Sequence, residues 1–74
     1  MANVLLLNSL GLIRSKRRLS FQKLSKMSGV SSTTLYRIEN GLCYPNHLNI
    51  LLISRALKLE VHEIFNINWH NMRL

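Results

Sequence analysis

Length, composition and charge limit the kinds of protein that this chain can be. Seventy-four residues, 47% of them apolar, suffice for at most one small domain with a marginal core. Ten lysines and arginines against three acids give a formal net charge of +7, which favours a polyanionic partner such as nucleic acid. The alternative is that the charge specifies no ligand, since small basic proteins are common.

The single cysteine and the apolar start bear on where the protein resides. Cys43 has no second cysteine to pair with, which fits a reducing cytosol and predicts a cytoplasmic protein. Residues 1–13 are apolar, but they lack a leading positive region and a small-residue cleavage site, and charge follows at Arg14. We therefore expect neither a signal peptide nor a membrane span.

The first predicted helix covers residues 4 to about 18. Leu6, Leu10 and Ile13 recur in it at the three- and four-residue spacing of one helix face. Gly11, inside this helix, costs roughly 1 kcal/mol relative to alanine. We expect it to permit a close approach by a neighbouring element.

Cations and surplus leucines accompany this first helix. Its last turns carry Arg14, Lys16, Arg17 and Arg18. The helix dipole favours positive charge there, and contact with phosphates is the alternative. The leucines off the main stripe are Leu5, Leu7 and Leu12, which pack within one subunit or form a dimer surface.

Residues 20 to 41 contain two short predicted helices joined by a tight corner. Ser20 is expected to cap a helix of about eight residues, in which Phe21, Leu24 and Met27 recur at a spacing of three. Leu24 and Met27 are assigned to the core. Gly29 can take the positive φ that a short reversal after a helix needs.

The third predicted helix, residues 32 to 40, follows a cap at Ser31, and Val30 is expected to pack against Leu35. Leu35 and Ile38 face the core. The opposite side carries Ser32, Thr33, Tyr36, Arg37 and Asn40. Two helices joined in this way are typical of the motif that sets a recognition helix in the major groove, although a plain helix corner has the same spacing.

A fourth helix is predicted after Pro45, with Asn46 as its cap. Its apolar stripe is assigned to Leu48, Leu51, Leu52, Ala56 and Leu57, with Ile50 and Ile53 beside it. A turn at residues 58–60 precedes a short fifth helix, 61–65, that closes the core. The domain therefore spans residues 1–65. The tail, 66–74, has no clear period, and we expect it to pack on this domain or on a second subunit.

The inventory of reactive residues argues against an enzyme. The three acids, Glu39, Glu60 and Glu63, show no spacing typical of a general acid/base pair. Cys43 and His47 on a short loop are a weak case for a nucleophile. The histidines show no metal-binding spacing, and there is no phosphate-binding glycine loop. We therefore predict no catalytic residue, no metal and no cofactor.

The run LSFQKLSKMSGVSSTTLYRIENG, followed by Pro45 and ALKLEVHEIF, resembles the phage-repressor or Xre family of DNA-binding domains. The resemblance covers about residues 6–65 and is strongest at residues 29–31 and 37–41. It implies an all-α fold, a compact five-helix bundle of the lambda-repressor-like type with a central helix-turn-helix.

The resemblance also implies residue roles. Ser32, Thr33 and Arg37 match positions that read base edges, with Tyr36 beside them, and Arg14 matches an arginine that pairs with the glutamate at Glu39. Ser20 and Asn40 match positions that hold phosphates. Nearby polar and basic side chains extend the expected phosphate contacts: Arg17, Arg18, Gln22, Lys23, Ser31, Thr34, Tyr44, Asn46 and His47. For each cation taken singly, a solvated surface charge is the alternative.

Two departures from the family pattern affect these expectations. Phe21 stands where many members have glutamine, so any phosphate contact there must come from backbone N–H groups or from Gln22. Lys58 stands where members have glycine after the fourth helix, which leaves the geometry of that turn open.

The expected function is that of a sequence-specific regulator of transcription that binds double-stranded DNA, a repressor rather than an activator. One domain covers a half-site, so a homodimer on a palindromic operator is expected. An alternative is a protein-interaction module, such as the antitoxin of a toxin–antitoxin pair, with a protein partner. Another is RNA or non-specific nucleic-acid binding. No membrane partner is expected.

Overall fold

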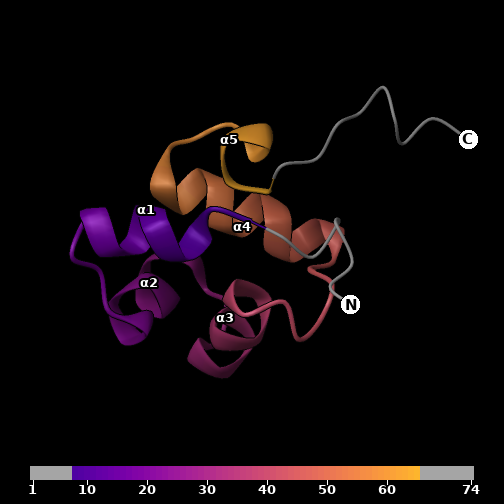
Figure 1. Ribbon diagram of the computed structural model, residues 1–74, viewed down its shortest axis with the longest axis horizontal. Helices are drawn as coiled ribbons and strands as arrows, with labels where there is room; N and C mark the ends of the chain where they lie inside the picture. The colour runs from indigo at the N-terminus through magenta and orange to yellow at the C-terminus, as the bar shows by residue number, and fades with distance from the viewer. Residues whose placement is uncertain (1–7, 66–74) are drawn as a thin grey trace, which may run out of the picture.

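The computed structural model describes residues 8–65, which fold as a bundle of helices joined by short turns (Figure 1). In chain order the helices are α1 (Leu10–Lys16), α2 (Phe21–Ser28), α3 (Ser32–Glu39), α4 (His47–Leu57) and α5 (Val61–Phe65). In Figure 1, α4 lies between α5 on one side and α2 and α3 on the other. The predicted all-α class with five helices is confirmed. Within residues 8–65, no helix has the length and apolar character needed to cross a membrane.

One apolar cluster at the centre of the bundle holds the helices together. Each helix, and the corner between α2 and α3, contributes to it; its members are Leu10, Leu24, Val30, Leu35, Ile38, Ile50, Ile53, Leu57, Ile64 and Phe65. Burying one such side chain contributes about 1.5–3 kcal/mol, so this cluster is the main source of stability. The prediction that α5 closes the core is confirmed by its buried Ile64 and Phe65.

The predicted helix boundaries at α2, α3 and α4 follow from local capping. Ser20, Ser31 and Asn46 each accept, through the side-chain oxygen, the backbone N–H three residues on, at 3.0, 3.1 and 2.7 Å. These bonds satisfy N–H groups that the first turn of a helix leaves unpaired. Gly29 ends α2 with a φ of +83°, the left-handed conformation expected of it.

The start of α1 differs from the prediction. The helix begins at Leu10 rather than at residue 4, and the predicted residues 4–7 lie outside the described part of the chain. Asn8 Oδ1 accepts the N–H of Leu10 at 3.0 Å, and the N–H of Ser9 donates to Ile64 O at 2.6 Å. These two bonds take Asn8 and Ser9 out of the helix and connect the chain to the end of α5.

Three apolar residues that were assigned to the core are exposed. Met27 is 45% exposed on α2, and Leu48 and Leu51 are 63% and 53% exposed on α4. The buried face of α4 instead consists of Ile50, Ile53, Ser54 and Leu57. Because α4 is apolar on almost every side, its sequence pattern does not identify the side that packs.

The turn after α4 keeps a left-handed cap without glycine. Lys58 adopts a φ of +57°. Its N–H donates to Arg55 O at 3.2 Å, and the N–H of Leu59 donates to Ser54 O at 3.0 Å. A non-glycine residue in this conformation costs roughly 1–2 kcal/mol.

Candidate nucleic-acid interface

A rigid corner sets the direction of α3 relative to α2. Gly29 supplies the left-handed reversal, and the buried Val30 anchors the corner in the core. The N–H of Val30 donates to Ser28 Oγ at 3.1 Å, and Ser31 then caps α3. Each residue of the corner is therefore held by a cap, by a bond or by burial.

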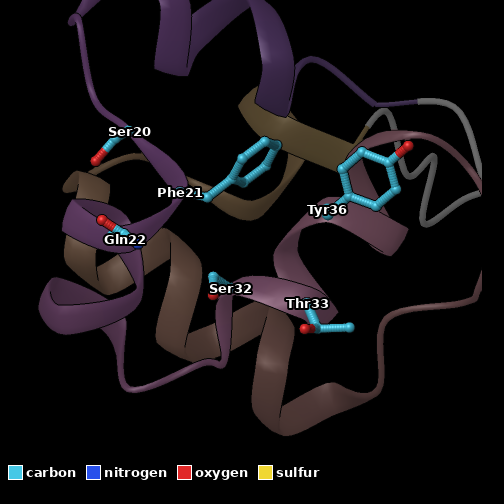
Figure 2. A pocket seen from close by; sticks show the side chains of 6 residues that line it. All are labelled: Ser20, Phe21, Gln22, Ser32, Thr33 and Tyr36. Atoms are coloured by element: carbon cyan, nitrogen blue, oxygen red, sulfur yellow. The ribbon is translucent and has the colours of Figure 1, made fainter.

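The starts of α2 and α3 border one hollow in the surface, with a volume of about 470 Å³ (Figure 2). Its lining residues are Ser20, Phe21 and Gln22 from the start of α2, and Ser32, Thr33 and Tyr36 from α3. The first N–H groups of a helix lack partners within it, and the helix dipole places positive charge there. Two such ends beside one hollow create a surface suited to phosphates.

The residues predicted to read bases lie on the outer side of α3. Thr33, Tyr36 and Arg37 are exposed and Ser32 is half-buried. The opposite side of the helix is buried in the core through Leu35 and Ile38. The short side chains at the start of α3 allow its backbone to approach a ligand closely.

The residues predicted to contact phosphates divide into groups by their surroundings. Gln22 and Lys23 are exposed on the first turn of α2. The hydroxyl of Ser31 donates its proton to Thr34 Oγ1 at 2.8 Å. That proton therefore serves the helix cap and is not offered to a phosphate. Asn40 Nδ2 donates to Tyr36 O at 2.9 Å and stays exposed. A third group, Tyr44, Asn46 and His47, is exposed between α3 and the first turn of α4.

Arg17 lies away from this hollow. Its Nη1 donates to Leu57 O at 2.7 Å, at the C-terminal end of α4. It borders a separate depression of about 280 Å³ together with Leu59 and Glu63. Arg17 therefore makes the favourable contact of a cation with a helix C-terminus, but the helix is α4 and not α1. Arg18 is exposed in the following turn, with a φ of +55°.

The ion pair implied for Arg14 and Glu39 is formed. Arg14 Nε donates to Glu39 Oε1 at 2.8 Å and Nη2 to Oε2 at 3.1 Å, while Nη1 donates to Leu19 O at 2.8 Å. The two side chains are 19% and 16% exposed, so water screens the pair only partly. The hydrogen bonds that Arg14 donates to Glu39 raise the pKa of Arg14 above its usual range, although burial opposes them. The stability that this raised pKa contributes to the folded state is lost only at strongly alkaline pH, above the range in which proteins work.

Gly11 makes room for this ion pair. A Cβ atom at that position would lie 3.0 Å from Glu39 Oε2. The predicted close approach to the first helix is therefore confirmed, and the approaching group is the Glu39 carboxylate. An alanine there would press on a carboxylate that Arg14 holds in place.

Phe21 has a role that the sequence did not reveal. The guanidinium carbon of Arg14 lies 4.0 Å from the centroid of the Phe21 ring. The rings of Phe21 and Tyr36 meet edge to face, with centroids 5.9 Å apart and an angle of 68°. The residue that replaces the family's glutamine thus links the ion pair to α3. The only signal in the sequence was the presence of two aromatic residues in the motif.

Negative charge is kept away from the α2–α3 side of the molecule. The sequence has three acids, and Glu39 is neutralised by Arg14. Glu60 and Glu63 lie at α5, across α4 from α2 and α3 (Figure 1). Within residues 8–65, the exposed charges of α2 and α3 are therefore the cations Lys23, Lys26 and Arg37, and an anionic partner meets no opposing carboxylate.

A fixed corner, two helix starts at one hollow and a polar outer face on the second helix define a DNA-binding helix-turn-helix domain. The sequence profile of a helix-turn-helix family matches residues 11–64, and the chain belongs to this Xre, lambda-repressor-like family. Members are DNA-binding regulatory domains and are not typically enzymes. No curated protein matched the chain.

Proposed function

We propose that this protein is a sequence-specific regulator of transcription, a repressor, that binds double-stranded DNA with helix 32–40 in the major groove. The observation that carries the proposal is the hollow at which the starts of α2 and α3 meet, beside the exposed face of α3. A helix of this size fits the major groove, where its exposed side chains reach base edges. Repression follows most simply because a bound domain excludes other proteins from the same DNA.

Base reading is assigned to the outer face of α3. Arg37 can donate two hydrogen bonds to guanine O6 and N7, a contact worth about 1–3 kcal/mol of discrimination. Thr33 offers a hydroxyl to a base edge and a methyl group to thymine. Ser32, nearer the hollow, bonds to a base edge or to a phosphate.

Phosphate binding is assigned to the groups around this face. The N–H groups of Phe21 and Gln22 point out of the first turn of α2, since the Ser20 hydroxyl takes the N–H of Lys23. The side chains proposed to assist are Arg18, Ser20, Gln22, Lys23, Thr34, Asn40, Tyr44, Asn46 and His47. Contacts of this kind position the protein and make its affinity fall as salt rises.

A homodimer on a palindromic operator is part of the proposal, because one domain reads only one half-site. Exposed leucines support it: Leu12 on α1, and Leu48 and Leu51 on α4. Light scattering should show two copies, and L48E/L51E should give a monomer that remains folded. The predicted dimer residues Leu5, Leu7 and the tail at 66–74 lie outside the described part of the chain.

The same leucines also favour the second candidate, a protein-interaction module such as an antitoxin that binds a toxin. Light scattering separates the two. A stable monomer with these leucines exposed would favour a different protein as the partner. A cytoplasmic location is proposed for either, since Cys43 is a free thiol that a reducing compartment preserves.

Selection of bound duplexes from a random pool tests the main proposal. The wild type should enrich a motif, and Arg37→Ala should lose a guanine preference at one position per half-site, with affinity about 10- to 100-fold lower. Arg55→Ala is the matched control, because Arg55 is also an exposed arginine and lies on α4. It should enrich the wild-type motif. If the wild type enriches no motif, the proposal of a specific regulator is wrong.

A further inference from the structure

Two aromatic rings form a wall of the hollow that phosphate binding does not use. Figure 2 shows Phe21, from the start of α2, and Tyr36, from α3, both at the hollow. Their edge-to-face contact, at 5.9 Å and 68°, is a preferred geometry for aromatic pairs. Phe21 is half-buried, whereas Tyr36 is 51% exposed, so Phe21 supports a ring that a ligand can reach.

The support behind Tyr36 extends to the ion pair. The Arg14 guanidinium lies 4.0 Å from the centroid of the Phe21 ring, an attractive cation–π arrangement. That guanidinium is itself held by Glu39 and by Leu19 O. Phe21 therefore cannot tilt away without losing this contact. The result is a rigid aromatic surface on the recognition face, where a flexible polar side chain would have been adaptable.

The chemistry of this surface selects its ligand. The aromatic rings of Phe21 and Tyr36 offer no donor to a phosphate apart from the Tyr36 hydroxyl, and Thr33 beside them adds a methyl group. Among the groups that DNA displays in the major groove, the 5-methyl of thymine is the apolar one. We infer that Tyr36 receives a thymine methyl, and that Phe21 is a positioning residue which holds the Tyr36 ring for this contact. The inference rests on the proposed function, since α3 must enter the major groove.

Exchange of thymine for deoxyuridine tests this inference, because it removes the methyl group alone. In the duplex enriched by selection, each thymine is replaced in turn, and the two duplexes compete for one protein sample. At the thymine that contacts Tyr36, one position per half-site, we expect the thymine duplex to bind about fourfold tighter, the effect of burying one methyl group. This ratio does not depend on the fraction of protein that is folded.

Variants of the two rings separate positioning from a merely structural role. Phe21→Leu keeps an apolar side chain but removes the ring, and the thymine preference should fall to about one. Phe21→Tyr keeps the ring and should restore the fourfold preference, as should Tyr36→Phe. Tyr36→Ala should abolish it. A purely structural role for Phe21 would weaken the binding of both duplexes equally and leave their ratio unchanged.

The outcomes distinguish this inference from the proposed function. If a motif is enriched but no deoxyuridine exchange lowers the affinity, the methyl contact is wrong and the regulator stands. If Phe21→Leu retains the fourfold preference, Phe21 does not position Tyr36. If no motif is enriched at all, both the inference and the proposed function are overturned.

Discussion

The two ends of α3 are held in opposite ways. At its start, Ser31 makes two bonds to Thr34, three residues further along the chain, and the side chains that follow are polar. At its end, Glu39 accepts a hydrogen bond from Arg14, which lies 25 positions earlier in the sequence. Ile38 O accepts a second one, at 2.8 Å, from Nδ2 of Asn8, which lies 30 positions earlier. Local bonds shape the start, whereas the rest of the fold holds the end.

This difference fits the work of a recognition helix. The long-range bonds fix the direction of α3 without covering its outer face. The side chains on that face, Thr33 in the first turn and Arg37 in the last, stay exposed for a ligand. A helix fixed before binding loses less conformational entropy on binding, so more of its contact energy appears as affinity.

The largest effect should come from removing the anchor at the end of α3. Arg14→Ala leaves the Glu39 carboxylate half-buried without its partner and also removes the contact with Phe21. Breaking a buried pair costs about 3–5 kcal/mol, and partial exposure reduces this to about 2–3 kcal/mol. Urea unfolding followed by circular dichroism measures the loss. Small domains are marginally stable, so a large part of the protein should unfold.

An exposed arginine on another helix provides the control for this variant. Arg55→Ala on α4 should change the free energy of unfolding by less than about 0.5 kcal/mol. If Arg14→Ala costs no more than Arg55→Ala, the ion pair does not anchor α3, and the contrast between its two ends disappears.

The contrast between local and long-range bonds also explains which structural features could be predicted correctly from the sequence. Ser20, Gly29 and Ser31 were assigned correctly, because caps and left-handed turns depend on residues a few positions apart. On α4, Leu48 and Leu51 were assigned to the core and are exposed. Apolar residues almost surround that helix, so only the position of its neighbours decides which side is buried.

The candidate site follows the same rule. The pair of Arg14 and Glu39 came from a resemblance to a family, because no local spacing connects residues on separate helices. The contact between Phe21 and Tyr36 was missed, since it depends on the angle that the corner sets between α2 and α3. For Arg17 the sequence left open a helix C-terminus or a phosphate as its partner, and its guanidinium donates to Leu57 O at the end of α4, a contact that depends on the fold.

An intermediate effect is expected at Asn8, the second residue that holds the end of α3. Asn8→Ala removes the bond to Ile38 O and the cap on the N–H of Leu10. Two such bonds contribute about 1–2 kcal/mol together, measured as a fall in the urea midpoint. Asn49→Ala, an asparagine within α4, is the control and should stay within about 0.5 kcal/mol. Equal losses in the two variants would mean that Asn8 does not secure α3.

The smallest effect is expected at the local start of α3, and two substitutions there separate its two roles. Ser31→Ala removes the N-cap and should cost about 1 kcal/mol of stability, whereas Ser31→Asp keeps a capping oxygen and should cost much less. The aspartate nevertheless places a negative charge beside Thr34, which is proposed to contact a phosphate, so the enriched duplex should bind it more weakly, and more so at low salt. An aspartate variant that is stable and binds as tightly as the wild type would show that the start of α3 does not face the DNA backbone. Stable folding with weakened binding would instead place the start of α3 near the DNA backbone.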